Sequence, residues 1–193
     1  MSSDWLPAEL PERFEHDGLV FVPLTPALVV PDYAAVMRDV PLLRAWSGQD
    51  WPTPEFTIAE NLADLERHDR EQQGGIALTY SVLLDGAVQG CVYARPFADA
   101  WRTRGAEPPA GKFAGHVAVR GWLHDRPAAD LVDATLALLG APRFAFRRVW
   151  WQTNSRCPEQ VAACAALGLT DEVKVAGAAQ VWMALAAPQD GGE

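Results

Sequence analysis

The chain has 193 residues, of which 49% are hydrophobic, and this length and composition suit one compact domain with its own core. Its formal net charge is −9, so we expect no nucleic-acid partner, because an acidic surface repels a phosphate backbone. The same charge favours a cationic partner such as an amine.

The N-terminal segment predicts neither export nor membrane insertion. It is acidic, is interrupted by Pro7 and Pro11, and lacks the basic segment and apolar core of a signal peptide. No apolar run approaches the roughly 18 residues that a membrane span needs. We therefore expect no membrane contact. The cysteines fit no CxxC pattern, so we expect a cytoplasmic protein with reduced thiols and no metal site.

The first half of the chain predicts a strand followed by helices. The stretch GLVFVPLTP predicts the strand, and the pattern from Thr25 to Trp46 predicts a helix with a break at Pro41. Thr57 and Glu60 have the spacing of a capping box, which places the start of the next helix.

The second half alternates strands with helices. Asp85-Gly86 between IALTYSVLL and AVQGCVYA is a strong hairpin signal, and Arg95–Lys112 is typical of a long loop. FAGHVAVRG and RRVWWQT predict strands that are each followed by a helix, and VKVAG and AQVWMALA predict the last two strands. A helical crossover makes the fourth and fifth strands parallel, within a mixed, mostly antiparallel sheet of about seven strands flanked by helices.

The stretch VWWQTNSRCPEQVAACAALGLT carries the most specific pattern. Through Trp151, Thr153 and Gly168 it resembles the fifth strand and following helix of the GNAT superfamily of acyl-CoA-dependent N-acetyltransferases. This resemblance covers roughly Leu19 to Leu185, and Gly90 just inside the second hairpin strand also fits it. It implies a single α/β acetyltransferase domain with acetyl-CoA as cosubstrate.

The resemblance also implies domain limits and a cofactor slot. We expect a GNAT-like domain over residues 19–187, an extension over 1–18 and a polar tail over 188–193. The fourth strand (Phe113–Val119) and the fifth (Arg147–Gln152) should splay apart, and acyl-CoA should enter between them.

The cofactor contacts implied by the resemblance begin with backbone groups of the fourth strand, and hence with Val117 and Val119. The family's diphosphate turn, Arg/Gln-x-x-Gly-x-Gly/Ala, corresponds here to LHDRPA, in which only Ala128 fits. Asp125 in that turn repels a diphosphate. Arg120, Gly121 and Arg126 are the residues that compensate if a cofactor binds, because an arginine fork holds phosphate oxygens. The alternative is an ordinary helix start without a ligand.

Two further positions depart from the family pattern. Cys157 stands where the usual cofactor-binding Asn is expected, and Cys164 stands where a Tyr often protonates the departing thiolate. Seven residues make about two helical turns, so we expect both thiols on one helix face. Cys164 is therefore a candidate acid, and the alternative is a small buried packing residue.

A histidine is the candidate general base. His116 should share a strand face with Ala118 and Arg120 and, if that face lines the cleft, takes the proton of an amine. The alternative is a histidine hydrogen-bonded at a strand surface. His124 is a second candidate, whereas His68 is predicted to be solvated on a charged helix.

The acceptor site is expected where the family's usually starts. Trp46, Asp50, Trp51 and Glu55 would give it aromatic walls and carboxylates that suit a cationic amine. The tryptophans could equally close the core.

Two functions remain open. One is a divergent acetyl-CoA-dependent N-acetyltransferase that acts on an amine of a small molecule or peptide, with a homodimer as a possible assembly. The alternative is a catalytically inactive GNAT-fold binding or interaction module, which the incomplete diphosphate turn favours.

Overall fold

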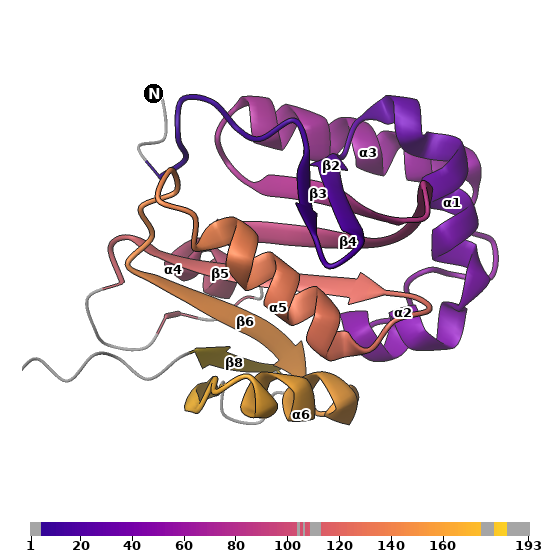
Figure 1. The fold of residues 1–193 in the computed structure, drawn as a ribbon. Helices are drawn as coiled ribbons and strands as arrows, with labels where there is room; N and C mark the ends of the chain where they lie inside the picture. The colour runs from indigo at the N-terminus through magenta and orange to yellow at the C-terminus, as the bar shows by residue number, and fades with distance from the viewer. Residues whose placement is uncertain (1–4, 104, 106, 109–112, 175–179, 185–193) are drawn as a thin grey trace, which may run out of the picture.

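The computed structural model describes residues 5–103, 105, 107–108, 113–174 and 180–184, and these form a single mixed sheet with helices on both faces (Figure 1). The sheet contains eight strands in the order β1-β2-β3-β4-β5-β6-β8-β7. The strands are β1 (Phe14–His16), β2 (Leu19–Pro23), β3 (Leu78–Leu84), β4 (Ala87–Pro96), β5 (His116–Leu123), β6 (Arg148–Asn154), β7 (Asp171–Lys174) and β8 (Gln180–Ala184). The helices are η1 (Pro26–Leu28), α1 (Val29–Arg38), α2 (Val40–Ser47), α3 (Ile58–Gln73), α4 (Phe97–Arg102), α5 (Ala128–Leu139) and α6 (Pro158–Ala166).

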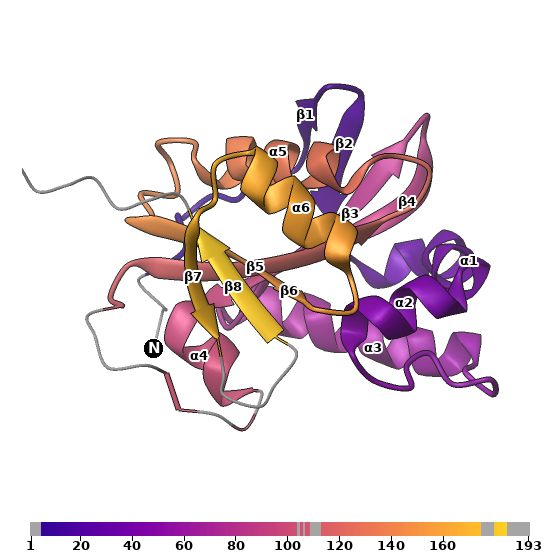
Figure 2. The same cartoon turned by 90° about the horizontal axis from the view of Figure 1, so that it is seen from below.

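The two faces of the sheet carry different helices. Figure 2 shows α5 and α6 on one side and α2, α3 and α4 on the other. Side chains alternate along a strand, so Val117 and Val119 enter the core beneath α5, while Ala118 and Trp122 face the opposite helices. The sheet therefore has one apolar cluster beneath α5 and two on the opposite face.

The hairpin predicted at Asp85-Gly86 is confirmed. Both residues have positive φ, 50° and 80°, as a tight hairpin turn requires. The pairing shifts register between Val82 and Leu83, which is typical of a β-bulge. The residue that follows the shift on β4 is Gly90. Glycine is required there because any Cβ would lie 2.2 Å from the carbonyl oxygen of Trp122.

The splay between the predicted fourth and fifth strands, which are β5 and β6, is confirmed. They run parallel and pair from His116↔Arg148 to Val119↔Trp151. Beyond that point β5 continues to pair with β4, and β6 pairs with β8 instead. The two strands therefore separate at their C-terminal ends.

Several elements differ from the predictions. The helix break lies at Asp39, because its carboxylate accepts from the backbone N–H of Leu42 at 3.0 Å and starts α2 there, with Pro41 in the first turn. Part of the predicted loop Arg95–Lys112 is helix α4, whose Phe97 is fully buried. In the expected extension, Phe14 pairs with Phe21, so β1 already belongs to the sheet.

The helix start predicted at Thr57 is found in the structure. The Thr57 hydroxyl accepts from the backbone N–H of Glu60, and the Glu60 carboxylate accepts from the N–H of Thr57, so the capping box is confirmed. The expected tail, residues 188–193, lies outside the described residues. Among the described helices, none is long and apolar enough to cross a bilayer.

Candidate active site

A cavity of about 360 Å³ opens beside the point where β5 and β6 separate. Arg120 and Gln152 are the first residues beyond the last pair, Val119 and Trp151, and both line the cavity. The remaining lining residues come from α2 and its following loop, α3, β4, β5 and the α4 region: Trp46, Ser47, Gln49, Trp51, Asp64, Arg67, His68, Tyr93, Arg95, Ala100, Thr103 and Ala118. We call this cavity the acceptor pocket.

An arginine stacked on an aromatic ring forms one wall of the acceptor pocket. The Cζ atom of Arg120 lies 3.8 Å from the ring centroid of Trp46 and 5.8 Å from that of Tyr93. The Trp46 and Tyr93 rings are themselves 5.8 Å apart. Cation–π contact of this kind fixes the guanidinium plane.

The other two arginines of the pocket are ion-paired. Arg67 lies 2.5 Å from a carboxylate oxygen of Asp64 and 3.4 Å from one of Glu71. Arg95 lies 2.5 Å from the same Glu71 carboxylate. Two carboxylates thus neutralise two guanidinium groups beside Arg120.

His68 lines the acceptor pocket, so its prediction as a solvated surface residue is wrong. It is 9% exposed, and its ring packs 5.1 Å from that of Tyr93. Burial, together with the neighbouring Arg67 charge, lowers the pKa of His68 to about 4. Its ring nitrogens lie 3.1 Å from Arg67 Nη2 and 3.4 Å from Thr79 Oγ1. The neutral ring therefore holds Arg67 in place.

The predicted acceptor residues divide into two groups. Trp46 and Trp51 line the pocket, with ring centroids 6.5 Å apart. Asp50 and Glu55 are exposed in the loop after α2 and are not part of the lining. The structure therefore does not bring these two acids to the pocket, because both are exposed in the loop.

The predicted cofactor residues on β5 fall into two groups, those that pair with strands on both sides and those beyond the last pair with β6. Val117 and Val119 are buried and pair with both neighbouring strands, so the unpaired edge begins only after Val119. Gly121 lies on that edge, and its carbonyl accepts from Gln160 Nε2 at 2.9 Å. Arg120 points to the opposite face of the sheet from α5, because successive side chains of a strand alternate.

The turn before α5 is held by two ion pairs. Both carboxylate oxygens of Asp125 accept from Arg38, at 2.6 and 2.7 Å, which lowers the pKa of Asp125. Arg126 Nε donates to Asp130 at 2.6 Å. Pro127 precedes the helix, Ala128 begins it, and no side chain caps it. Arg126 is therefore a cation that lies just before the first turn of α5.

The two thiols expected on one helix face lie in different cores. Cys164 is fully buried with Leu131 and Trp151, whereas Cys157 precedes α6 as its N-cap and packs near Trp122. The expectation of a shared face is wrong, because Cys157 lies outside the helix. Burial raises the pKa of each thiol to about 12. Such burial favours packing over acid catalysis at Cys164, and it leaves Cys157 enclosed by side chains.

The histidines proposed as bases lie away from the acceptor pocket. His116 is at the end of β5 that pairs with β6, where its Nδ1 accepts from Trp150 Nε1 at 3.1 Å. It lines a second recess near Phe97 and Phe113. Burial, with the charges of Arg148 and Arg147 adding to it, lowers the pKa of His116. His124 is buried, with Nε2 2.9 Å from the carbonyl of Ala35.

One contributor to the site escaped the sequence analysis. Asn154, at the end of β6, donates from Nδ2 to the carbonyls of Ala45 and Trp46, at 3.0 and 2.8 Å. Its Oδ1 accepts from the backbone N–H of Arg156 at 2.8 Å. This side chain ties the turn before α6 to the C-terminal end of α2, which carries Trp46. Its signal in the sequence is a polar residue between a predicted strand and a helix that starts at a proline.

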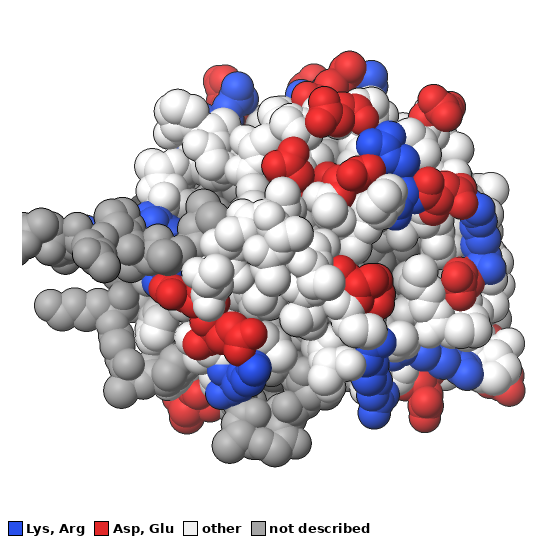
Figure 3. All heavy atoms as spheres, turned by 60° about the horizontal axis from the view of Figure 1, so that its bottom comes forward, with Lys and Arg blue, Asp and Glu red and all other residues white. Residues whose placement is uncertain are grey.

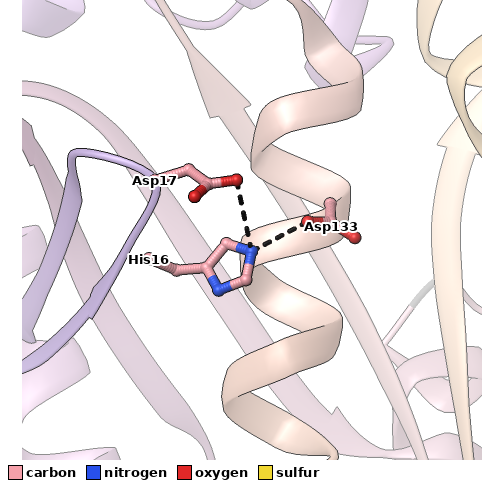
Figure 4. Close-up of side chains that lie close together, drawn as sticks. All are labelled: His16, Asp17 and Asp133. Carbon is pink, nitrogen blue, oxygen red and sulfur yellow. Dashed lines mark hydrogen bonds and ion pairs between the residues drawn. The ribbon is translucent and has the colours of Figure 1, made fainter.

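A second polar cluster lies on the surface, and none of its residues lines the acceptor pocket. His16 Nε2 lies 2.8 Å from Asp133 Oδ2 and 3.8 Å from Asp17 Oδ2 (Figure 4). The three side chains lie close enough to hold a metal ion, but a single nitrogen faces both carboxylates. The hydrogen bond between His16 and Asp133 joins the end of β1 to α5, and this contact alone accounts for the closeness of the side chains.

The outer surface mixes charges of both signs. On the side that lies at the bottom of Figure 1, acidic and basic side chains are interspersed around a broad uncharged area (Figure 3).

The strand order, the parallel β5–β6 pair and its splay match the fold that the GNAT resemblance implies, and solved acetyltransferase structures share this fold over most of the chain. RimL, a ribosomal L7/L12 α-N-protein acetyltransferase solved with coenzyme A, is 15% identical with a TM-score of 0.64, over 88% of this chain and 93% of RimL. The microcin C7 self-immunity acetyltransferase MccE, solved with acetyl-CoA and AMP, is 9% identical with a TM-score of 0.65, over 88% and 92%. AAC(6′)-Ib, solved with paromomycin and acetyl-CoA, is 14% identical with a TM-score of 0.62, over 88% and 93%. No protein-family model matches the sequence, and neither does any curated protein.

Proposed function

We propose that this protein is an acetyl-CoA-dependent N-acetyltransferase that acts on an amine of a small molecule or peptide. The observation that best supports this function is that the acceptor pocket begins at Arg120 and Gln152, immediately beyond the last β5–β6 pair. An acyl donor in the gap between the strands would therefore meet an acceptor held in the pocket. The similar structures solved with coenzyme A or acetyl-CoA support this assignment.

The residues around the gap fit acetyl-CoA. The backbone of Gly121 lies on the unpaired edge of β5 and would hold the pantetheine amides. Arg126 and the first N–H groups of α5, beginning near Ala128, would hold the diphosphate. Arg38 offsets the charge of Asp125 in the same turn. When bound, acetyl-CoA supplies a thioester as the acyl donor.

The contribution of the pocket to catalysis is mainly positioning. Holding the amine against the thioester removes several kcal/mol of the barrier, on the order of 7 or more in well-aligned cases. The amine must lose its proton before it attacks. His68 is a weak base because its pKa is lowered to about 4, so we propose that the amine loses its proton to bulk solvent in an equilibrium before it attacks as the neutral amine. The rate should then rise with pH toward the pKa of the acceptor amine.

Two observations favour the alternative, a GNAT-fold binding module without acetyl transfer. The Gly121 carbonyl is already bonded to Gln160, and the turn before α5 lacks the glycines that allow a backbone to approach a diphosphate. In this alternative the gap stays closed and the acceptor pocket alone binds a ligand.

Calorimetry with acetyl-CoA separates the two functions. The acetyltransferase predicts saturable binding of acetyl-CoA, followed by release of free thiol when an acceptor amine is added. Saturable binding without thiol release for any amine in a broad panel would also count against acetyl transfer. Absence of acetyl-CoA binding by the folded protein would overturn the proposed function.

A further inference from the structure

We infer that the acceptor pocket takes an amine that also carries a carboxylate, and that Arg120 binds this carboxylate. The inference rests on the proposed function for the fate of the amine. Its evidence is the charge balance of the pocket, the pose of Arg120 and its place beside the gap.

Among the described residues, Arg120 is the cation of the pocket that no carboxylate neutralises. Arg67 and Arg95 are paired with Asp64 and Glu71, and the ring of His68 is neutral near pH 7 because its pKa is about 4. Arg120 lines the same pocket, and within the described part of the chain its guanidinium has no hydrogen bond or ion pair. In a chain with a net charge of −9, an unneutralised arginine in a cavity indicates an anionic ligand.

The pose of Arg120 leaves its donors available. Stacking on Trp46 uses the face of the guanidinium, whereas its five N–H donors point outward in the plane. A carboxylate accepts two of these donors in parallel, which makes this the strong, bidentate form of the contact. Trp46 is itself fixed, because its carbonyl accepts from Asn154. The arginine is therefore oriented before a ligand arrives.

The place of Arg120 determines which ligand fits. It is the first residue of β5 beyond the last pair with β6, so a carboxylate bound to it puts a nearby amine at the opening between the strands. A volume of about 360 Å³ is at the small end for ligand sites, which suits a free amino acid or a molecule of that size. Trp51 and Tyr93 supply apolar walls for a side chain.

The test measures binding to the full-length protein without acetyl-CoA. Calorimetry compares L-phenylalanine with L-phenylalaninamide and L-alanine with L-alaninamide, pairs that differ only in the carboxylate. We expect at least one acid to bind about tenfold or more tightly than its amide. Arg120→Met keeps the aliphatic stem on Trp46 and should abolish this preference, and Arg120→Lys should retain only part of it. Arg70→Met removes the same charge from the exposed side of α3 and should change nothing.

The outcomes separate this inference from the proposed function. Equal binding of acid and amide, binding of neither, or a preference that survives Arg120→Met would overturn the inference even if acetyl transfer to other amines is observed. Tighter binding of phosphoethanolamine than of every amino acid would replace the carboxylate with a phosphate and also overturn it. Carboxylate-dependent binding that is lost in Arg120→Met but occurs without acetyl transfer would uphold it while the proposed function fails.

Discussion

The side-chain amide of Gln160 donates to the backbone carbonyl of Gly121 at 2.9 Å, across the gap between β6–α6 and β5. The oxygen of the same amide lies 3.5 Å from Trp151 Nε1. Gln160 is buried, and its contact occupies a backbone carbonyl on the edge of β5 that β6 no longer covers. A pantetheine amide that binds the same carbonyl must displace it.

Gln160→Ala should therefore strengthen acetyl-CoA binding. One hydrogen bond inside the protein contributes about 1 kcal/mol, so we expect the Kd to fall about fivefold or more, while the free energy of unfolding falls by a similar amount. Calorimetry with acetyl-CoA measures the first effect and chemical denaturation the second. Glu159→Ala, at an exposed position on the same helix, is the matched control. An unchanged or higher Kd in Gln160→Ala would show that the side chain does not compete with the cofactor.

Arg126 and Arg120 should differ in their effect on the cofactor. Arg126 lies at the start of α5, whereas Arg120 faces the acceptor pocket across the sheet. Arg126→Ala should weaken acetyl-CoA binding by about tenfold, the loss of one charge-assisted contact. Arg120→Met should leave that binding within about twofold and affect only the acceptor. Equal losses in the two variants, measured by calorimetry, would contradict the separation of the two sites.

The buried carboxyl of Asp32 should make stability depend on pH. Asp32 is 4% exposed, and burial raises its pKa from 3.8 to about 6, although the hydrogen bond from Asn61 Nδ2 at 2.9 Å opposes the rise. Because the folded protein holds this proton more tightly than the unfolded chain, the contribution is present below pH 4 and is lost as pH rises through 6. Its full size is on the order of 3 kcal/mol.

Asp32→Asn removes this dependence. At pH 7 the variant should be more stable than the wild type by on the order of 1–3 kcal/mol, and the difference should shrink toward pH 4. Urea denaturation of both proteins at pH 4.5, 6 and 7.5 measures it, and taking the difference cancels the opposite contribution of His68. A stability difference that stays constant across this range would mean that Asp32 is charged throughout.

Cys164 should behave as a packing residue. It is fully buried, and its pKa of about 12 keeps the thiol protonated. Cys164→Ala should cost about 1 kcal/mol through a small cavity and leave acetyl transfer within about twofold. Cys164→Tyr should overpack the core beneath α6 and destabilise the protein further. A hundredfold loss of turnover in a folded Cys164→Ala protein would make the thiol catalytic.

Local signals predicted most of the fold because they depend on few residues. The Asp85-Gly86 turn and the Thr57–Glu60 capping box are set by backbone geometry within four residues, and the structure contains both. The strand–helix unit around Trp151 also carried enough pattern to predict the splay. In contrast, α4 begins directly after Pro96 in a proline- and glycine-rich stretch, where its short apolar face around Phe97 has no visible period.

The site was harder to predict because it depends on which face of an element meets which neighbour. The charges around His68 indicate an exposed helix, but the sheet covers that part of α3. Arg120 fitted a diphosphate contact by its position in sequence, and strand alternation turned it to the acceptor pocket instead. The contact of Asn154 with α2 spans more than a hundred residues, so no local pattern contains it.

Both borders of the sheet are short strands. β1 has three residues and β7 has four, and β7 reads DEVK, whereas the strands inside are longer. A border strand offers unpaired backbone groups to any passing chain, and short, charged borders limit how many such bonds a second copy can form. This arrangement should suppress association by sheet extension, and with it fibrillar aggregation. A homodimer of this protein would then have to use its helices or loops as the contact surface.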